Sequence, residues 1–171
     1  MLATNQPAPS LSVPLLGGGT FDLSSEAPEH FTLVLFYRGK HCPLCTKQME
    51  EDVLPNLDKL AETGVGVVAV SMDDADRAQA QAGDWVGKGL RVGYGLTEEK
   101  AREWGLYMSS KREGSEEPAL FSEPGMTLIY PDGRVYAHWQ QSVPFARPKV
   151  AELLGGLGFI IEKGYPARGT A

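Results

Sequence analysis

Two uninterrupted apolar runs stand out along the chain. Residues 31–37 read Phe-Thr-Leu-Val-Leu-Phe-Tyr and residues 65–71 read Val-Gly-Val-Val-Ala-Val-Ser. Neither run alternates apolar with polar residues, which is typical of strands covered on both faces. Between them, apolar residues recur every three or four positions from Pro43 to about Glu62, which predicts a helix with a kink at Pro55. A strand, a helix and a second strand in this order predict a parallel pair of strands.

The remaining elements are predicted from weaker patterns. Gly17 to Gly19, between short apolar patches, indicates an N-terminal β-hairpin, and Asp132-Gly133 indicates a second hairpin near the end of the chain. Further predicted elements are helices over about 74–88 and 97–104, a weak strand at 92–95, the hairpin strands 126–130 and 135–139, and a helix from about 148. Residues 111–123 are mostly polar, which predicts a long loop with Glu113, Glu116 and Glu117 as a solvated charge run. The order predicts an α/β fold, a mixed central sheet with helices on both faces.

The composition is that of an ordinary globular protein. The 171 residues are 42% hydrophobic and 22% charged, which argues against intrinsic disorder and favours one domain over residues 1–171. The formal net charge of -6 leaves no basic surface for nucleic acid or anionic lipid. No apolar run has membrane-spanning length, and the N-terminus lacks the basic and apolar regions of a signal peptide, so we expect a cytoplasmic protein.

The two cysteines of the chain form one Cys-x-x-Cys motif where a buried strand ends and a helix begins. Cys42 and Cys45 are separated by Pro43 and Leu44, and Pro43 is suited to the first helical turn. Unpaired N–H groups at a helix start favour a thiolate over a thiol. Because Cys45 continues the apolar face of the helix, we expect it to be the buried resolving thiol and Cys42 the more exposed nucleophile.

The basic residues just before the motif could support its chemistry. Arg38, Lys40 and His41 precede Cys42 and would stabilise its thiolate if their side chains point toward it. His41 is either a solvated loop residue or a proton shuttle.

The two cysteines could instead form half of a zinc site, a structural disulfide or two inert buried thiols. A closed zinc site needs two more ligands and the chain has three histidines, so we expect no metal and no other cofactor.

The stretch Phe36-Tyr-Arg-Gly-Lys-His-Cys-Pro-Leu-Cys45 resembles the peroxiredoxin-like branch (AhpC/TSA, redoxin) of the thioredoxin-fold superfamily. Pro-Ala-Pro at 7–9, Ser-Met-Asp at 71–73, Trp-Gly-Leu at 104–106 and the Asp-Gly turn follow in the family's order, so the resemblance covers roughly residues 5–155. It implies a thioredoxin-like fold. Residues 155–171 then form a C-terminal extension, an apolar patch on a flexible glycine-rich tether. It would cover either its own domain or a second subunit, and we favour a homodimer contact.

The resemblance also implies roles for individual residues. In the peroxiredoxin motif Pro-x-x-x-Thr-x-x-Cys, the proline falls here at Arg38, the threonine at Cys42 and the peroxidatic cysteine at Cys45. The family's arginine falls near Pro124, so it is replaced as well. Pro124 matches the position at which thioredoxin-fold proteins carry a cis-proline facing their dithiol, and we expect a cis bond there.

These observations favour a thiol–disulfide oxidoreductase in which Cys42 attacks a protein or small-molecule disulfide and Cys45 resolves the mixed disulfide. A cellular dithiol would re-reduce the enzyme. The alternative is a thiol peroxidase with Cys45 as the peroxidatic and Cys42 as the resolving cysteine. A third hypothesis is a binding module whose dithiol is idle or holds a metal with ligands from a partner. Arg38, His41, Pro43 and Pro124 are the expected supporting residues.

Overall fold

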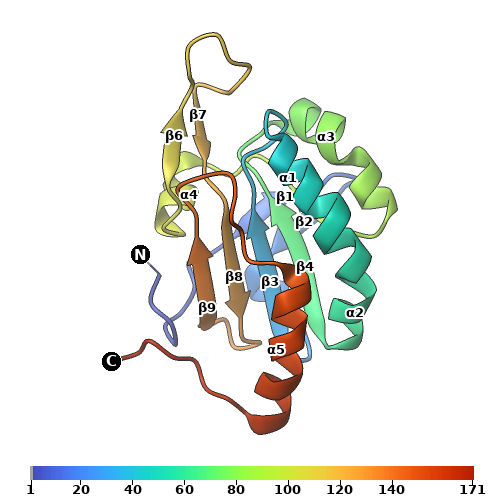
Figure 1. Cartoon of the computed structure of the whole chain (residues 1–171), viewed down its shortest axis with the longest axis vertical. Helices are drawn as coiled ribbons and strands as arrows, with labels where there is room; N and C mark the ends of the chain where they lie inside the picture. Colours follow the sequence, from blue (N-terminus) through green and yellow to red (C-terminus); the bar gives the residue numbers. More distant parts are fainter. Residues whose placement is uncertain (1) are drawn as a thin grey trace.

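The two apolar runs form the centre of a five-stranded sheet in a computed structural model, which describes residues 2–171 (Figure 1). β3 (Phe31–Phe36) and β4 (Val65–Val70) pair in parallel, as the sequence predicts. The strand order is β5-β4-β3-β8-β9, with β8 and β9 antiparallel to their neighbours. The other strands are β5 (Arg91–Gly93), β8 (Gly125–Ile129) and β9 (Val135–Gln140). The sheet is therefore mixed, with its parallel strands on one side.

The helical segment between β3 and β4 is divided into four parts. α1 (Pro43–Gln48) continues through a π-helical segment (Met49–Val53) and a 3-10 turn (Leu54–Asn56) into α2 (Leu57–Glu62). Pro55 cannot donate a backbone hydrogen bond, and its ring excludes a regular α-helical turn before it. Where the sequence predicts a kink at Pro55, the helix departs from regular α-helical geometry.

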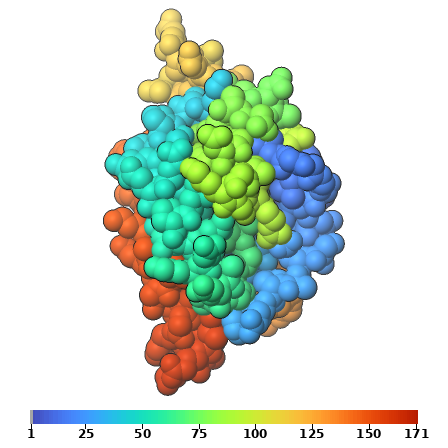
Figure 2. All heavy atoms as spheres, turned by 90° about the vertical axis from the view of Figure 1, so that its right-hand side faces the viewer, coloured from blue at the N-terminus to red at the C-terminus, as the bar shows by residue number. Residues whose placement is uncertain are grey.

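Both faces of the sheet are covered. On one face, Leu33 and Leu35 of β3 belong to a core shared with α1, α2, α3 (Ala75–Gly87) and α5 (Val150–Lys163). On the other face, Val34 and Phe36 belong to a core shared with α4 (Glu98–Glu103) and the hairpin of β1 (Ser12–Pro14) and β2 (Thr20–Asp22). Figure 2 shows α1, α2 and α3 side by side on the molecule's flank. The α/β architecture, with a mixed central sheet, both faces covered and an N-terminal β-hairpin, is confirmed.

Two irregular segments are more ordered than the sequence predicts. β6 (Met108–Ser110) and β7 (Leu120–Ser122) form an antiparallel hairpin, which confines the loop expected over residues 111–123 to residues 111–119, and the hairpin tip projects from the body in Figure 2. Residues 155–163 of the expected tether lie instead within α5, since Leu157 is fully buried and Ile160 and Ile161 pack on the core. The apolar residues recur at helical spacing, and burying them offsets the low helix propensity of the three glycines between them. No helix within residues 2–171 has the length and apolar character needed to cross a membrane.

Candidate active site

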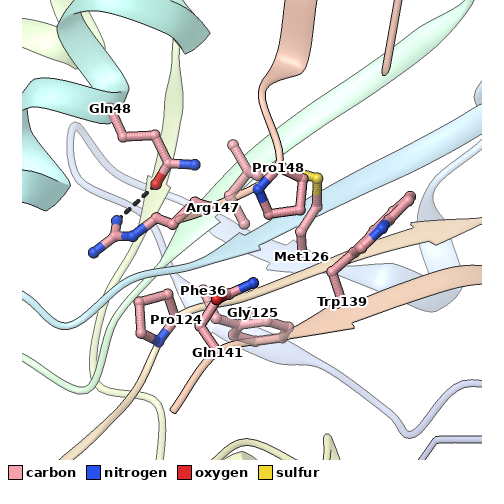
Figure 3. A pocket seen from close by; sticks show the side chains of 10 residues that line it. Phe36, Gln48, Pro124, Gly125, Met126, Trp139, Gln141, Arg147 and Pro148 are labelled. Carbon is pink, nitrogen blue, oxygen red and sulfur yellow. Dashed lines mark hydrogen bonds between the residues drawn. The ribbon is translucent and has the colours of Figure 1, made fainter. Parts of the chain in front are cut away.

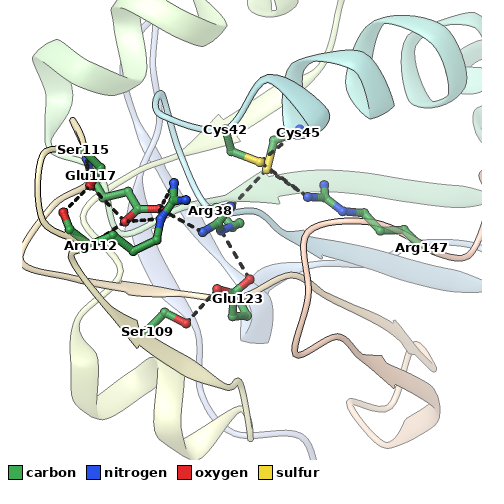
Figure 4. A network of polar contacts seen from close by, with 9 residues as sticks. All are labelled: Arg38, Cys42, Cys45, Ser109, Arg112, Ser115, Glu117, Glu123 and Arg147. Atoms are coloured by element: carbon green, nitrogen blue, oxygen red, sulfur yellow. Dashed lines mark hydrogen bonds and ion pairs between the residues drawn. The ribbon is translucent and has the colours of Figure 1, made fainter.

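The dithiol lies at the carboxyl end of β3, as the position of the motif predicts. Cys42 is the N-cap of α1, Pro43 opens the helix, and Cys45 lies in its first turn (Figure 4). The Cys42 N–H donates to the Gly39 carbonyl over 3.0 Å. Gly39 has a φ of +109°, and a Cβ at this position would lie 2.4 Å from the Asp73 carboxylate, which accepts the Lys40 N–H. The turn that presents Cys42 therefore requires glycine.

Three N–H donor groups surround the two sulfurs. The Cys45 N–H donates to Cys42 Sγ over 3.3 Å, and the Arg38 N–H donates to Cys45 Sγ over 3.4 Å. Nη2 of Arg147 lies 3.2 Å from Cys45 Sγ and 3.6 Å from Cys42 Sγ. Both cysteines are free thiols in the structure. The site thus places three N–H donor groups and one positive charge around two adjacent sulfurs, as Figure 4 shows.

The surroundings shift the two thiol pKa values in opposite directions. Hydrogen bonds from the Cys45 side chain and N–H, together with Arg147, outweigh burial and lower the pKa of Cys42 to about 5. Burial, followed by the interaction with the Cys42 sulfur, raises the pKa of Cys45 despite Arg147. Cys42 is therefore the group that ionises first, and Cys45 holds its proton while Cys42 is a thiolate.

The expected exposure of Cys42 was wrong. Its exposed fraction is 1% and that of Cys45 is 0%. The sequence placed Cys42 before the first helical turn and so predicted an exposed thiol. Residues 141–149, which follow β9, bring Arg147 against the Cys42 sulfur from a distant part of the chain. The two cysteines differ in their hydrogen bonds and charge rather than in exposure.

Arg147 is a functional residue that the sequence did not reveal. Its Nη1 donates to the Gln48 amide oxygen over 2.7 Å and its Nε donates to the Pro144 carbonyl over 2.9 Å. These two anchors direct Nη2 toward the sulfurs, as Figure 3 shows for the contact with Gln48. The arginine stands 102 residues after Cys45. No local pattern connects it with the dithiol, so only the tertiary structure brings it there.

The Arg38 side chain does not point toward Cys42, so the condition under which it would stabilise the thiolate is not met. Its guanidinium pairs with Glu117 and Glu123 over 3.3 Å each and lies 4.7 Å from the centre of the Phe121 ring. Only its backbone N–H reaches a sulfur. The two acidic partners belong to the β6–β7 hairpin and to the residue that follows β7, so the ion pairs join this hairpin to the loop before the dithiol.

Glu117 is not the solvated residue that was expected. It is 4% exposed, and hydrogen bonds from the Arg112 backbone, Ser115 and the Arg112 side chain lower its pKa to about 2. Polar residues at a hairpin tip are usually solvated, but here the tip folds back on itself and encloses the carboxylate. Glu117 in the tip and Glu123 after β7 together pair with the Arg38 guanidinium.

His41 packs against the β6–β7 hairpin, and Pro124 lines a small pocket next to Arg147. The His41 ring packs edge-on against Phe121 with centroids 4.5 Å apart, and burial followed by Arg38 lowers the pKa of His41. Pro124 has a trans peptide bond, since residues 2–171 contain no cis bond, and the expected cis-proline was wrong. Pro124 and Arg147 line one pocket of about 10 Å³ with Gln48 and Gly125, room for about one water molecule (Figure 3).

The metal interpretation gains no further ligand from the structure. Among residues 2–171, no group of three or more histidine, cysteine or acidic side chains is arranged to hold a metal ion. The two sulfurs have an arginine and backbone N–H groups around them, and these are donors rather than metal ligands.

Comparison with known proteins places this site in a family. The sequence model of the Redoxin family matches residues 3–154. The chain belongs to the Redoxin family. It is accordingly a thiol-dependent oxidoreductase with a thioredoxin-like, peroxiredoxin-like fold. No curated protein matches the sequence.

Solved structures share the fold of this Redoxin-family chain at low sequence identity. A mutant of peroxiredoxin 6 from Arenicola marina has a TM-score of 0.78 at 13% identity, covering 96% of this chain and 76% of that one. Peroxidoxin BcpB from Mycobacterium tuberculosis has a TM-score of 0.73 at 16% identity, with coverage of 94% and 99%. Reduced Prx3 from Vibrio vulnificus, solved in complex with hydrogen peroxide, has a TM-score of 0.75 at 18% identity, with coverage of 92% and 99%.

Proposed function

We propose that this member of the Redoxin family is a thiol–disulfide oxidoreductase with Cys42 as the nucleophile and Cys45 as the resolving thiol. The observation that carries the proposal is the opposite behaviour of the two thiols. The Cys42 sulfur accepts the Cys45 N–H and lies beside Arg147, which favours its thiolate, whereas burial keeps Cys45 protonated. A thiolate next to a protonated thiol is the arrangement that disulfide exchange requires.

The reaction proceeds in two exchange steps. The Cys42 thiolate attacks one sulfur of the substrate disulfide, a mixed disulfide forms, and the other half of the substrate leaves as a thiolate. Cys45 then loses its proton and attacks Cys42 Sγ, which forms the Cys42–Cys45 disulfide and releases the second half of the substrate. The two electrons pass from the dithiol to the substrate, and a cellular dithiol returns them to the enzyme.

The supporting residues hold this geometry. Pro43 begins the helix at a position where a backbone N–H would have no partner within the helix. The Arg38 backbone N–H donates to the Cys45 sulfur. His41 packs on Phe121, and Pro124 borders the small pocket beside Arg147, whose guanidinium contacts both sulfurs. In this proposal the substrate is a protein or small-molecule disulfide. A homodimer through α5 stays part of the proposal, since the Phe159 side chain is 54% exposed.

Two serine variants test the assignment. Cys42→Ser is expected to abolish disulfide reduction, because it removes the attacking thiolate. Cys45→Ser is expected to accumulate a mixed disulfide with the substrate, which intact-mass spectrometry detects. Full disulfide-reductase activity in Cys42→Ser would show that the roles are wrongly assigned. Leu44→Ala, at the exposed position between the cysteines, is the matched control and should retain turnover.

A thiol peroxidase with Cys45 as the peroxidatic residue is the second candidate. The Cys45 sulfur has two donors directed at it, the Arg38 N–H and Arg147 Nη2, and such donors would also polarise a peroxide. The raised pKa of Cys45 argues against it, since the thiolate is the reactive form. Peroxide consumption by Cys42→Ser, with a sulfenic acid trapped on Cys45, would favour the peroxidase.

A further inference from the structure

Arg147 is a single cation that reaches both sulfurs. Its Nη2 lies 3.2 Å from Cys45 Sγ and 3.6 Å from Cys42 Sγ. Its other contacts are neutral oxygens of Gln48 and Pro144. None of the ion pairs found in residues 2–171 includes Arg147. The positive charge of this guanidinium is therefore directed at the dithiol, and no carboxylate shares it.

The two thiols differ in how much they depend on that charge. Cys42 has a closer donor of its own, because the Cys45 N–H is 3.3 Å from its sulfur and Arg147 is 3.6 Å away. For Cys45 the order is reversed, since Arg147 at 3.2 Å is nearer than the Arg38 N–H at 3.4 Å. The Arg38 guanidinium adds no charge at the sulfurs, because Glu117 and Glu123 hold it.

The competition between the thiols ends when Cys42 reacts. In the reduced enzyme the Cys42 thiolate opposes ionisation of Cys45 through its charge and through the hydrogen bond that it accepts from the Cys45 side chain. Once Cys42 is part of a mixed disulfide, its sulfur is neutral and both effects disappear. Arg147 is then left beside Cys45 alone, with no second anion at the site.

We propose that Arg147 is a catalytic residue that serves the two thiols in turn, first stabilising the Cys42 thiolate that attacks and then the Cys45 thiolate that resolves the mixed disulfide. The inference rests on the proposed function and extends it to the resolving step. The proton leaving Cys45 goes to the departing thiolate of the substrate, and the pair of electrons that forms the Cys42–Cys45 bond comes from Cys45. One charge is sufficient because the two thiolates form one after the other.

The two steps should respond differently to the loss of Arg147. With a pKa of about 5, Cys42 stays a thiolate near neutral pH even if its pKa rises by one unit, so its attack should change little. Cys45 is protonated at that pH, so each unit added to its pKa should slow its attack about threefold, after allowing for its greater nucleophilicity. Replacing a cation at contact distance in a buried site shifts a pKa by about two units, which predicts resolution about tenfold slower.

Rapid mixing of the reduced enzyme with dipyridyl disulfide separates the steps. The first equivalent of thiopyridone reports attack by Cys42 and the second reports resolution by Cys45, and this probe carries no charge that Arg147 could attract. Arg147→Gln is expected to leave the first phase within about threefold of wild type and to slow the second about tenfold. Arg147→Lys should restore part of the second phase. Arg102→Gln, which removes an exposed arginine from α4, is the charge-matched control and should change neither phase.

The outcomes separate this inference from the function on which it rests. A second phase at the wild-type rate in Arg147→Gln, or equal slowing of both phases, would overturn the role in resolution while leaving disulfide exchange intact. Thiopyridone release by Cys42→Ser at the wild-type rate would overturn the proposed function and this inference with it. Gln48→Leu keeps the charge and removes one anchor, so it should slow the second phase less than Arg147→Gln and provides the test if that variant does not fold.

Discussion

The Cys42 thiolate should make the stability of the reduced protein depend on pH. Its pKa falls from an ordinary value of 9.0 to about 5 because the Cys45 side chain and N–H donate to its sulfur and Arg147 adds a positive charge. In the unfolded chain these groups are dispersed, and the thiol returns to its ordinary pKa. The folded state therefore stabilises the Cys42 thiolate more than the unfolded state does, and it binds the proton less tightly.

The sign and size of the effect follow from the two pKa values. Because the pKa of Cys42 is lower in the folded protein, ionisation of this thiol adds to the unfolding free energy. The contribution is complete above the unfolded pKa, near pH 9, and is lost as the pH falls through about 5. Between these limits each pH unit contributes about 1.4 kcal/mol. From pH 6 to pH 8 the reduced wild-type protein should gain about 2.5 kcal/mol of unfolding free energy relative to a variant that cannot ionise at this position.

Urea unfolding of the reduced wild type and of Cys42→Ser measures this gain. The two proteins share every other titratable group, so the difference between their unfolding free energies reports the Cys42 thiol together with its effect on Cys45. Leu44→Ala, at the exposed position between the cysteines, should show the wild-type dependence on pH. A difference between wild type and Cys42→Ser that stays constant from pH 6 to pH 8 would refute the reasoning, because it would mean that the fold does not stabilise the thiolate.

Two further predictions concern parts of the structure that the sequence did not reveal. Arg38→Met leaves Glu117 and Glu123 buried without this cation, and the loss should lower the unfolding free energy by about 3 kcal/mol, measured in urea. Arg112→Met, at an exposed arginine that also pairs with Glu117, should cost less than Arg38→Met because the Arg112 N–H and Ser115 still donate to the carboxylate, and equal costs for the two variants would contradict the account of the network. Leu157→Ala should cost about 3 kcal/mol because the side chain is fully buried, and an unchanged thermal midpoint would mean that α5 does not complete the core.

The sheet and most helices could be predicted because their signals are local. The uninterrupted apolar runs of β3 and β4 follow from burial on both faces, and α4 lies within the helix expected over about 97–104. The β6–β7 hairpin was missed because its polar tip contains Glu117, which looks solvated in the sequence and is buried by contacts within the tip. The glycines of α5 likewise indicated a tether, whereas Leu157 packs in the core.

The sequence by itself determined the α/β fold and the position of a Cys-x-x-Cys motif at the end of a buried strand, because hydrophobic periodicity and the start of a helix are encoded by neighbouring residues. The tertiary structure alone decided the surroundings of the sulfurs. It buried Cys42, turned Arg38 toward Glu123 and brought Arg147 to both thiols from beyond the last strand. A thiol pKa depends on charges and donors within a few ångströms in space, and chain folding rather than sequence spacing sets those distances.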